Sequence, residues 1–300
     1  MARARSTDCG PVPGPGYGIV DSPGWTTERR RTALRAYVRA FETKSLRVGA
    51  GVHRTLTGRT ARARTVVRMN SERVTTAAPR GLRAVPDLTG LRLAHRAILA
   101  DADRLAGLLA DLAAGARPVS PERAAAIAAY LRRYNRAVRA HHRGEAEILW
   151  PLVLDAAADP AGAIADIVRF VDDHRALEAL QTAADAAADG FATDPAHGAP
   201  ELAALLARRR DLLIDHIRAE EEHLLPVITA QIPGAAYAAA EAAIARAGRP
   251  GTARAGEVDG DADWVRGWLL SHATAEEVRR LLRGRAGAGA PPPGRIWWRR

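Results

Sequence analysis

The chain has a single cysteine, Cys9, among its 300 residues. One cysteine excludes an internal disulfide and a zinc site built from several thiolates. Aromatic residues are also scarce, at 5%. No apolar run reaches the roughly 18 residues that a membrane-spanning helix needs, and the Arg-bearing N-terminus leads into proline, glycine and charged residues instead of the apolar core of a signal peptide. We therefore expect a cytoplasmic protein with no membrane partner.

The charge of the chain is unevenly distributed. The formal net charge is +10, and residues 1–68 hold 14 basic and 4 acidic residues, so the whole surplus lies there. Two interpretations follow: a basic arm that binds nucleic acid or an acidic surface, or a disordered leader, with Met69 as the true start. The absence of interleaved aromatic residues and of a binding motif favours the leader. Residues 1–85 are thus expected to be a disordered basic extension, and nucleic acid is not expected as a partner.

The remaining chain has the composition of helices. Ala, Leu and Arg dominate it, and alternation of Val, Ile and Thr is nearly absent. Apolar residues at helical spacing predict four amphipathic helices, and Gly, Pro and capping residues predict their ends. These helices are expected from Pro86 to about Ala114, from Ser120 to about Ala158, from Asp159 to Gly190, and from Pro200 to about Pro226, with a loop over Gly190 to Pro200. The pattern predicts an all-α, up-down-up-down four-helix bundle over residues 86–232.

Residues 233–300 are expected to form a small helical C-terminal extension and a tail. The predicted elements are a short helix from Ala235 to Ala247, a linker from Gly248 to Gly260, and a helical pair over Trp264 to His272 and Thr274 to Arg283. Two adjacent tryptophans, Trp297 and Trp298, are expected to dock on the bundle because indoles carry a large apolar area.

Two segments of the predicted bundle repeat one pattern: His-x-x-x-Glu, then a hydrophobic pair and proline. The first runs from His141 to Pro151 and the second from His216 to Pro226. Residues four apart lie on one face of a helix, so each copy directs an imidazole and a carboxylate the same way. A further histidine precedes each copy: His95 lies 46 residues before His141, and His174 lies 42 residues before His216.

In an antiparallel bundle these residues can meet at one level of the core. A single His-x-x-x-Glu pair is usually a solvated ion pair, and a lone histidine on an apolar face is usually a core residue. Burying four imidazoles and two carboxylates without a cation, however, would leave costly unpaired groups. The set therefore predicts two metal ions, each bound by two histidines, with both carboxylates bridging, and such mixed ligation suits iron, manganese or zinc. Its members are His95, His141, Glu145, His174, His216 and Glu220.

With Leu149-Trp150-Pro151 and Leu224-Leu225-Pro226, these residues resemble the hemerythrin-like, or HHE cation-binding, family over about residues 86–230. The resemblance implies a non-haem di-iron centre, with manganese or zinc less expected than two iron ions. Oxygen-carrying hemerythrins have two histidines one turn apart on the third helix, whereas here His174 is followed by Glu178. The sequence is more similar to the iron–sulfur-repair branch of the family, which is linked to nitric oxide and oxidative stress.

The function implied by this resemblance is binding of a small diatomic ligand or oxidant. Oxygen, nitric oxide or peroxide would be engaged for sensing, stress protection or iron handling. No Ser or Cys nucleophile and no general acid–base pair stands beside the metal ligands, so a metal- and ligand-binding protein is expected in preference to a dedicated enzyme. The alternatives are a nucleic-acid or protein interaction module that uses the basic arm, and a ferritin-like metal-dependent oxidase. The sequence does not predict the oligomeric state.

Several neighbours of the motif residues leave alternatives open. Glu178 is either a seventh ligand or, as favoured, an exposed acid or a salt-bridge partner of Arg175. His142 is expected at the surface or behind the ligands, although a register that uses it in place of His141 is possible. The other neighbours are Tyr134, expected in the core or above the metals; Asp173 and Asp215, candidate acceptors for the imidazoles; and His223, which would complete one of the two Glu-x-x-His motifs that a ferritin-like site needs.

Overall fold

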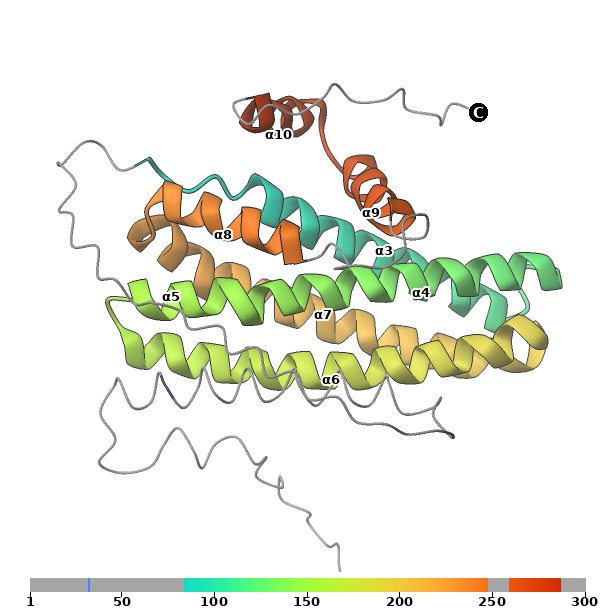
Figure 1. Ribbon diagram of the computed structural model, residues 1–300. Helices are drawn as coiled ribbons and strands as arrows, with labels where there is room; N and C mark the ends of the chain where they lie inside the picture. Colours follow the sequence, from blue (N-terminus) through green and yellow to red (C-terminus); the bar gives the residue numbers. More distant parts are fainter. Residues whose placement is uncertain (1–31, 33–83, 248–258, 287–300) are drawn as a thin grey trace, which may run out of the picture.

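The computed structural model describes residues 84–247 and 259–286, together with Thr32. Within these ranges every regular element is a helix (Figure 1), as the composition predicts. None of the helices in the described part of the chain combines the length and apolar character that crossing a membrane requires. The predictions for the basic extension, apart from Ala84 and Val85, and for Trp297 and Trp298 lie outside the described residues.

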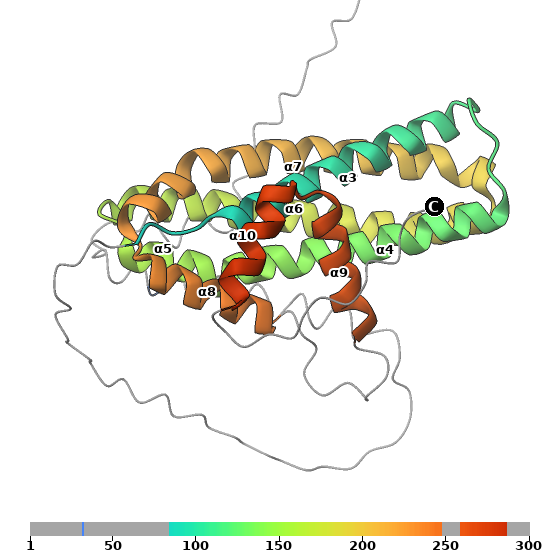
Figure 2. The ribbon, with the colours of Figure 1, turned by 90° about the horizontal axis from the view of Figure 1, so that it is seen from above.

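Four long helical rods run alternately up and down along one axis (Figures 1 and 2). The predicted up-down-up-down four-helix bundle is therefore confirmed. Its second rod is not a single α-helix, because a π-helical turn interrupts it. The elements are α3 (Thr89–Ala113), α4 (Pro121–Gly144), the π-helix η1 (Glu145–Leu149), α5 (Trp150–Ala156), α6 (Pro160–Thr193) and α7 (Pro195–Gln231).

Side-chain caps fix where three of these helices begin. The Ser120 hydroxyl accepts a hydrogen bond from the Arg123 amide (3.3 Å), and the Asp159 carboxylate accepts from the amides of Ala161 and Gly162 (both 3.1 Å). Asp194 likewise caps α7. In each case proline occupies the first turn, where its missing N–H costs nothing.

The predicted loop between Gly190 and Pro200 is wrong. α6 continues to Thr193 and α7 begins at Pro195, so Asp194 alone connects them. This connection requires a close approach of the two helices, and Gly198 permits it, since a Cβ atom at this position would lie only 2.5 Å from the Cα atom of Phe191. The Gly and Pro residues that predicted a loop instead allow a tight helical turn.

Two apolar clusters fill the bundle, one toward each end. The first extends along α4 as far as Val138 and along α6 from Leu177 onward. The second lies along the η1–α5 rod from Ala146 onward and along α6 as far as Val171. The gap between the clusters, at the same level on every helix, contains the histidine and glutamate residues of the two repeated motifs.

Three further helices cover one side of the bundle: α8 (Gly234–Ala247), α9 (Asp259–Ser271) and α10 (Ala275–Ala286). α8 packs against η1, and α9 and α10 lie over α3 (Figures 1 and 2). The Trp268 indole N–H of α9 donates to the buried Asp101 carboxylate (2.9 Å), and Arg96 pairs with Glu277 of α10 (2.6 Å). The helical C-terminal extension thus has specific polar contacts with the bundle.

Candidate metal centre

Every rod of the bundle contributes to one buried cluster. α3 supplies His95, the α4–η1 rod supplies His141, His142 and Glu145, α6 supplies His174, and α7 supplies His216 and Glu220. All of these side chains are buried except that of His141, which is 14% exposed. The six residues that the sequence singles out therefore lie together at one level.

The first half of the cluster faces α3. The Nε2 atom of His141 lies 2.9 Å from Oε1 of Glu145, and Nε2 of His95 lies 3.5 Å from the same oxygen. The two imidazole rings meet edge to face, with their centroids 5.2 Å apart. Two imidazole nitrogens and one carboxylate oxygen thus converge within the reach of a single cation.

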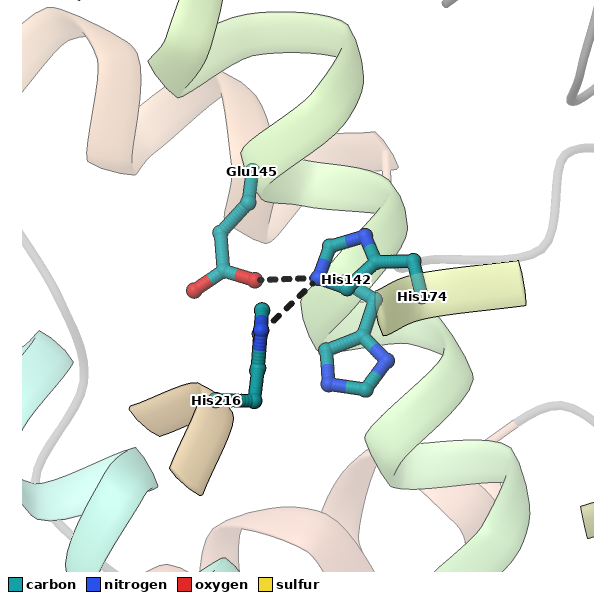
Figure 3. Close-up of side chains that lie close together, drawn as sticks. All are labelled: His142, Glu145, His174 and His216. Carbon is teal, nitrogen blue, oxygen red and sulfur yellow. Dashed lines mark hydrogen bonds and ion pairs between the residues drawn. The ribbon is translucent and has the colours of Figure 1, made fainter. Parts of the chain in front are cut away.

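The second half faces α6 and α7 (Figure 3). The Nε2 atoms of His174 and His216 lie 3.1 Å apart, and Nε2 of His174 lies 3.7 Å from Oε2 of Glu145. His142 stacks on His174, with a centroid distance of 4.1 Å and an interplanar angle of 19°. These four side chains form a second group of potential ligand atoms.

Both carboxylates lie between the two histidine groups. The two oxygens of Glu145 face different groups, Oε1 toward His95 and His141 and Oε2 toward His174. Glu220 does the same with one oxygen: Oε2 lies 3.7 Å from Nε2 of His95 and 3.7 Å from Nε2 of His216. The arrangement is that of two cation positions sharing two carboxylates.

The unpaired atoms of the cluster fit a metal site. Among the described residues, the buried side-chain atoms without a hydrogen-bond partner include Nε2 of His95 and of His141, both oxygens of Glu145, and Oε2 of Glu220. Leaving such groups unpaired in a protein core is costly, whereas a bound cation would use every one of them as a ligand. The residues present therefore fit a pair of metal ions.

Outer contacts orient the same imidazoles. The Nδ1 atom of His95 lies 2.9 Å from Oε1 of Glu221, and Nδ1 of His216 lies 3.4 Å from Oδ2 of Asp173. These carboxylates hold the N–H on Nδ1, so that Nε2 is left with its lone pair directed into the cluster. Asp173 on α6 thus contacts the His216 imidazole of the neighbouring helix α7.

The electrostatics of the cluster are in conflict without a cation. Burial lowers the pKa of His95, but contacts with Glu145 and Glu221 outweigh it and raise that pKa to about 10. Burial also opposes ionisation of Glu145, yet the histidines around it hold its pKa well below the usual range. Burial and the neighbouring Glu145 charge raise the pKa of Glu220. Two carboxylates this close cannot both ionise easily unless positive charge is placed between them.

The π-helical turn η1 shapes the Glu145 side of the cluster. The Trp150 amide donates to the Glu145 carbonyl, five residues back, and Pro151 follows with no N–H to donate. The widened turn lets Trp150 point into the core, where its indole N–H donates to Oε1 of Glu220 (3.1 Å). The predicted continuous helix from Ser120 to about Ala158 is wrong at this turn.

His142 is buried, which rules out the surface position and leaves the other two expected positions, behind the ligands or in the register that uses it. Its neighbour His141 faces α3, whereas His142 faces α6 and stacks on His174. A bundle helix has two neighbours, and its buried arc spans more than the 100° that separates adjacent residues. Burial and the surrounding positive groups lower the pKa of His142 well below its ordinary value.

The remaining neighbours lie outside the cluster. Glu178 pairs with Arg139 on α4 (3.0 Å). The side chain of His223 is 41% exposed and lies beside Asp166, so it does not join Glu220 in the cluster as a Glu-x-x-His motif of a ferritin-like site would require. Tyr134 packs in the core and donates to the Ile98 carbonyl (2.8 Å), and Asp215 is exposed.

Comparison with known proteins identifies the family of the bundle. One family model, described as Hemerythrin HHE cation binding domain, matches residues 87–228. Neither the curated proteins nor the solved structures give a match. The matched range contains the two motifs, the preceding His95 and His174, and the η1 turn.

Proposed function

Because residues 87–228 belong to the hemerythrin HHE cation binding domain family, we propose that this cluster holds two iron ions and engages a small diatomic ligand or oxidant. Oxygen, nitric oxide and peroxide are the ligands of this class. The observation that supports the proposal most strongly is the position of Glu145 and Glu220, each between the two histidine groups. One isolated ion would not require two shared carboxylates.

Each proposed ion would have two histidine ligands. His95 and His141 would hold one ion, His174 and His216 would hold the other, and Glu145 and Glu220 would be shared between them. Imidazole and carboxylate ligands without thiolate suit iron in a redox role better than a structural zinc ion. His142 is a further imidazole of the second group: its ring stacks on His174, and its Nε2 is buried without a hydrogen-bond partner.

Bound iron would supply Lewis acidity and one-electron redox chemistry at this position. The chain supplies an environment that excludes water and larger molecules. Trp150 stacks on His174 (centroids 4.6 Å apart), Phe170 contacts the edge of His216, and apolar clusters close the bundle on both sides. Such closed surroundings favour ligands of a few atoms over larger substrates.

Iron content tests the metal part of this proposal. Protein from iron-supplemented cells is expected to contain about two iron ions per chain, with near-ultraviolet absorption. Glu145→Ala, which removes a shared carboxylate, should lose both ions. The exposed His197→Ala on α7 is the matched control and should keep both, while His142→Ala tests whether that imidazole is a ligand. A well-folded wild-type chain without stoichiometric metal would overturn the proposal.

Ligand binding is tested separately on the iron-loaded protein. The reduced protein should change its optical spectrum on titration with oxygen or nitric oxide, saturating at a fixed ratio of ligand to protein. A loaded protein whose spectrum responds to neither these gases nor peroxide would contradict the ligand assignment and leave the metal assignment standing.

A further inference from the structure

A second set of buried polar side chains lies in the bundle. It is between the metal cluster and the end of the bundle where α3 connects to α4 and α6 connects to α7. We call Asn135 on α4, Gln181 on α6 and Arg209 on α7 the polar layer. Each lies seven residues from a histidine of the cluster: His142, His174 and His216, respectively. Because the helix directions alternate, all three displacements point toward the same end of the bundle (Figure 1). Seven residues are two helical turns, or about 10 Å, so the layer is distinct from the metal centre.

The polar layer buries a positive charge. Arg209 and Gln181 are each 1% exposed, and Asn135 is fully buried. Within the described part of the chain no carboxylate lies at ion-pair distance from Arg209, and burial lowers the pKa of its guanidinium. The acid that acts on it from further away, Asp185, is already held by Asn135 (2.7 Å) and Arg139 (3.0 Å). A buried guanidinium without a direct counter-charge is strongly unfavourable.

Two N–H donors of the polar layer have no hydrogen-bond acceptor. Arg209 donates to Oδ1 of Asn135, and its guanidinium carbon lies 4.7 Å from the centre of the Tyr134 ring. Among the described residues, Nε of Arg209 and Nε2 of Gln181 are buried donors with no acceptor. The layer therefore lacks acceptors and negative charge. A water molecule would accept these bonds but would bring two further donors, whereas an anion only accepts.

We propose that the polar layer binds one small monovalent inorganic anion, of the class of chloride or nitrate, between Nε of Arg209 and Nε2 of Gln181. The anion neutralises the buried guanidinium and accepts hydrogen bonds from the unpaired N–H groups of Arg209 and Gln181. The site needs no iron, because none of its residues belongs to the metal cluster, so it stands or falls independently of the proposed function.

Anion-dependent stability tests this site on the iron-loaded full chain. Gluconate, which is too large for a closed bundle, is replaced by chloride or nitrate at constant ionic strength. A saturable rise in Tm of about 3–5 °C is expected when the anion reaches ten times its dissociation constant. Arg209→Met should abolish the rise, Gln181→Leu should weaken it, and the exposed His197→Ala should leave it unchanged.

Two measurements locate the anion. A bromide-soaked crystal should show an anomalous peak beside Nε of Arg209, and the metal-site variant Glu145→Ala should keep the rise in Tm. The proposal is overturned if chloride or nitrate does not raise the Tm of the wild type, or if the bromide peak is absent. It is also overturned if the rise in Tm survives Arg209→Met but is lost in Glu145→Ala. If Arg209→Met does not fold, Gln181→Leu and the bromide peak decide the question.

Discussion

Trp150→Phe is expected to weaken iron binding although Trp150 is not itself a ligand. The substitution keeps an aromatic ring over His174 but removes the indole N–H that donates to Oε1 of Glu220 (3.1 Å). Loss of such an outer contact typically lowers metal affinity by about 10- to 100-fold. A hydrogen bond to a charged group stabilises the fold by about 1.5–3 kcal/mol, and the smaller ring leaves an additional void. We therefore expect the free energy of unfolding to fall by about 3 kcal/mol.

Competition with an iron chelator measures the affinity, and chemical denaturation of the same samples measures the stability. Trp264→Phe is the matched control, because Trp264 stacks on Trp268 in α9 and makes no contact with the cluster. The control should lose some stability without losing iron affinity. The reasoning is refuted if Trp150→Phe binds iron as tightly as the wild type, since the indole would then play no part in holding Glu220.

Three further predictions concern the helices away from the metal centre. Trp268→Ala leaves the buried Asp101 without one of its donors and removes a large ring, so it should cost about 3–5 kcal/mol and expose α9 to limited proteolysis. Burial raises the pKa of Glu241 to about 7, so the folded state holds this proton more tightly than the unfolded chain. The unfolding free energy should therefore fall by about 1–2 kcal/mol as pH rises from 4.5 to 7, and Glu241→Gln should flatten this slope in denaturation titrations. Gly198→Val would drive a side chain into the Phe191 backbone and should lower Tm, with Gly107→Ala, which has open space around it, as the control.

The bundle and the six candidate ligands could be predicted because both depend on helical periodicity. A His-x-x-x-Glu pair has one orientation on an α-helix, and the two copies, on the second and fourth rods of the bundle, can meet only in the core. The position of Glu145 depends in addition on the π turn after it, which no periodicity reveals. Pro151 inside an apolar helical stretch is the signal that could have indicated it.

The features that sequence reasoning missed depend on contacts between helices. The burial of His142 beside His141 depends on two inward directions on one helix, because α4 packs against both α3 and α6. Composition predicts a loop over Gly190 to Pro200, but Gly198 has no side chain to keep α6 and α7 apart, so both helices continue into this segment. The Arg139 partner of Glu178 lies on an adjacent helix, where helical spacing along one chain segment does not reveal it.

An anomalous difference map at the iron edge tests the central claim most directly. Two peaks are expected inside the bundle, one beside His95 and His141 and the other beside His174 and His216, with Glu145 and Glu220 between them. A single peak, or two peaks away from the shared carboxylates, would contradict the account of a centre with two metal ions.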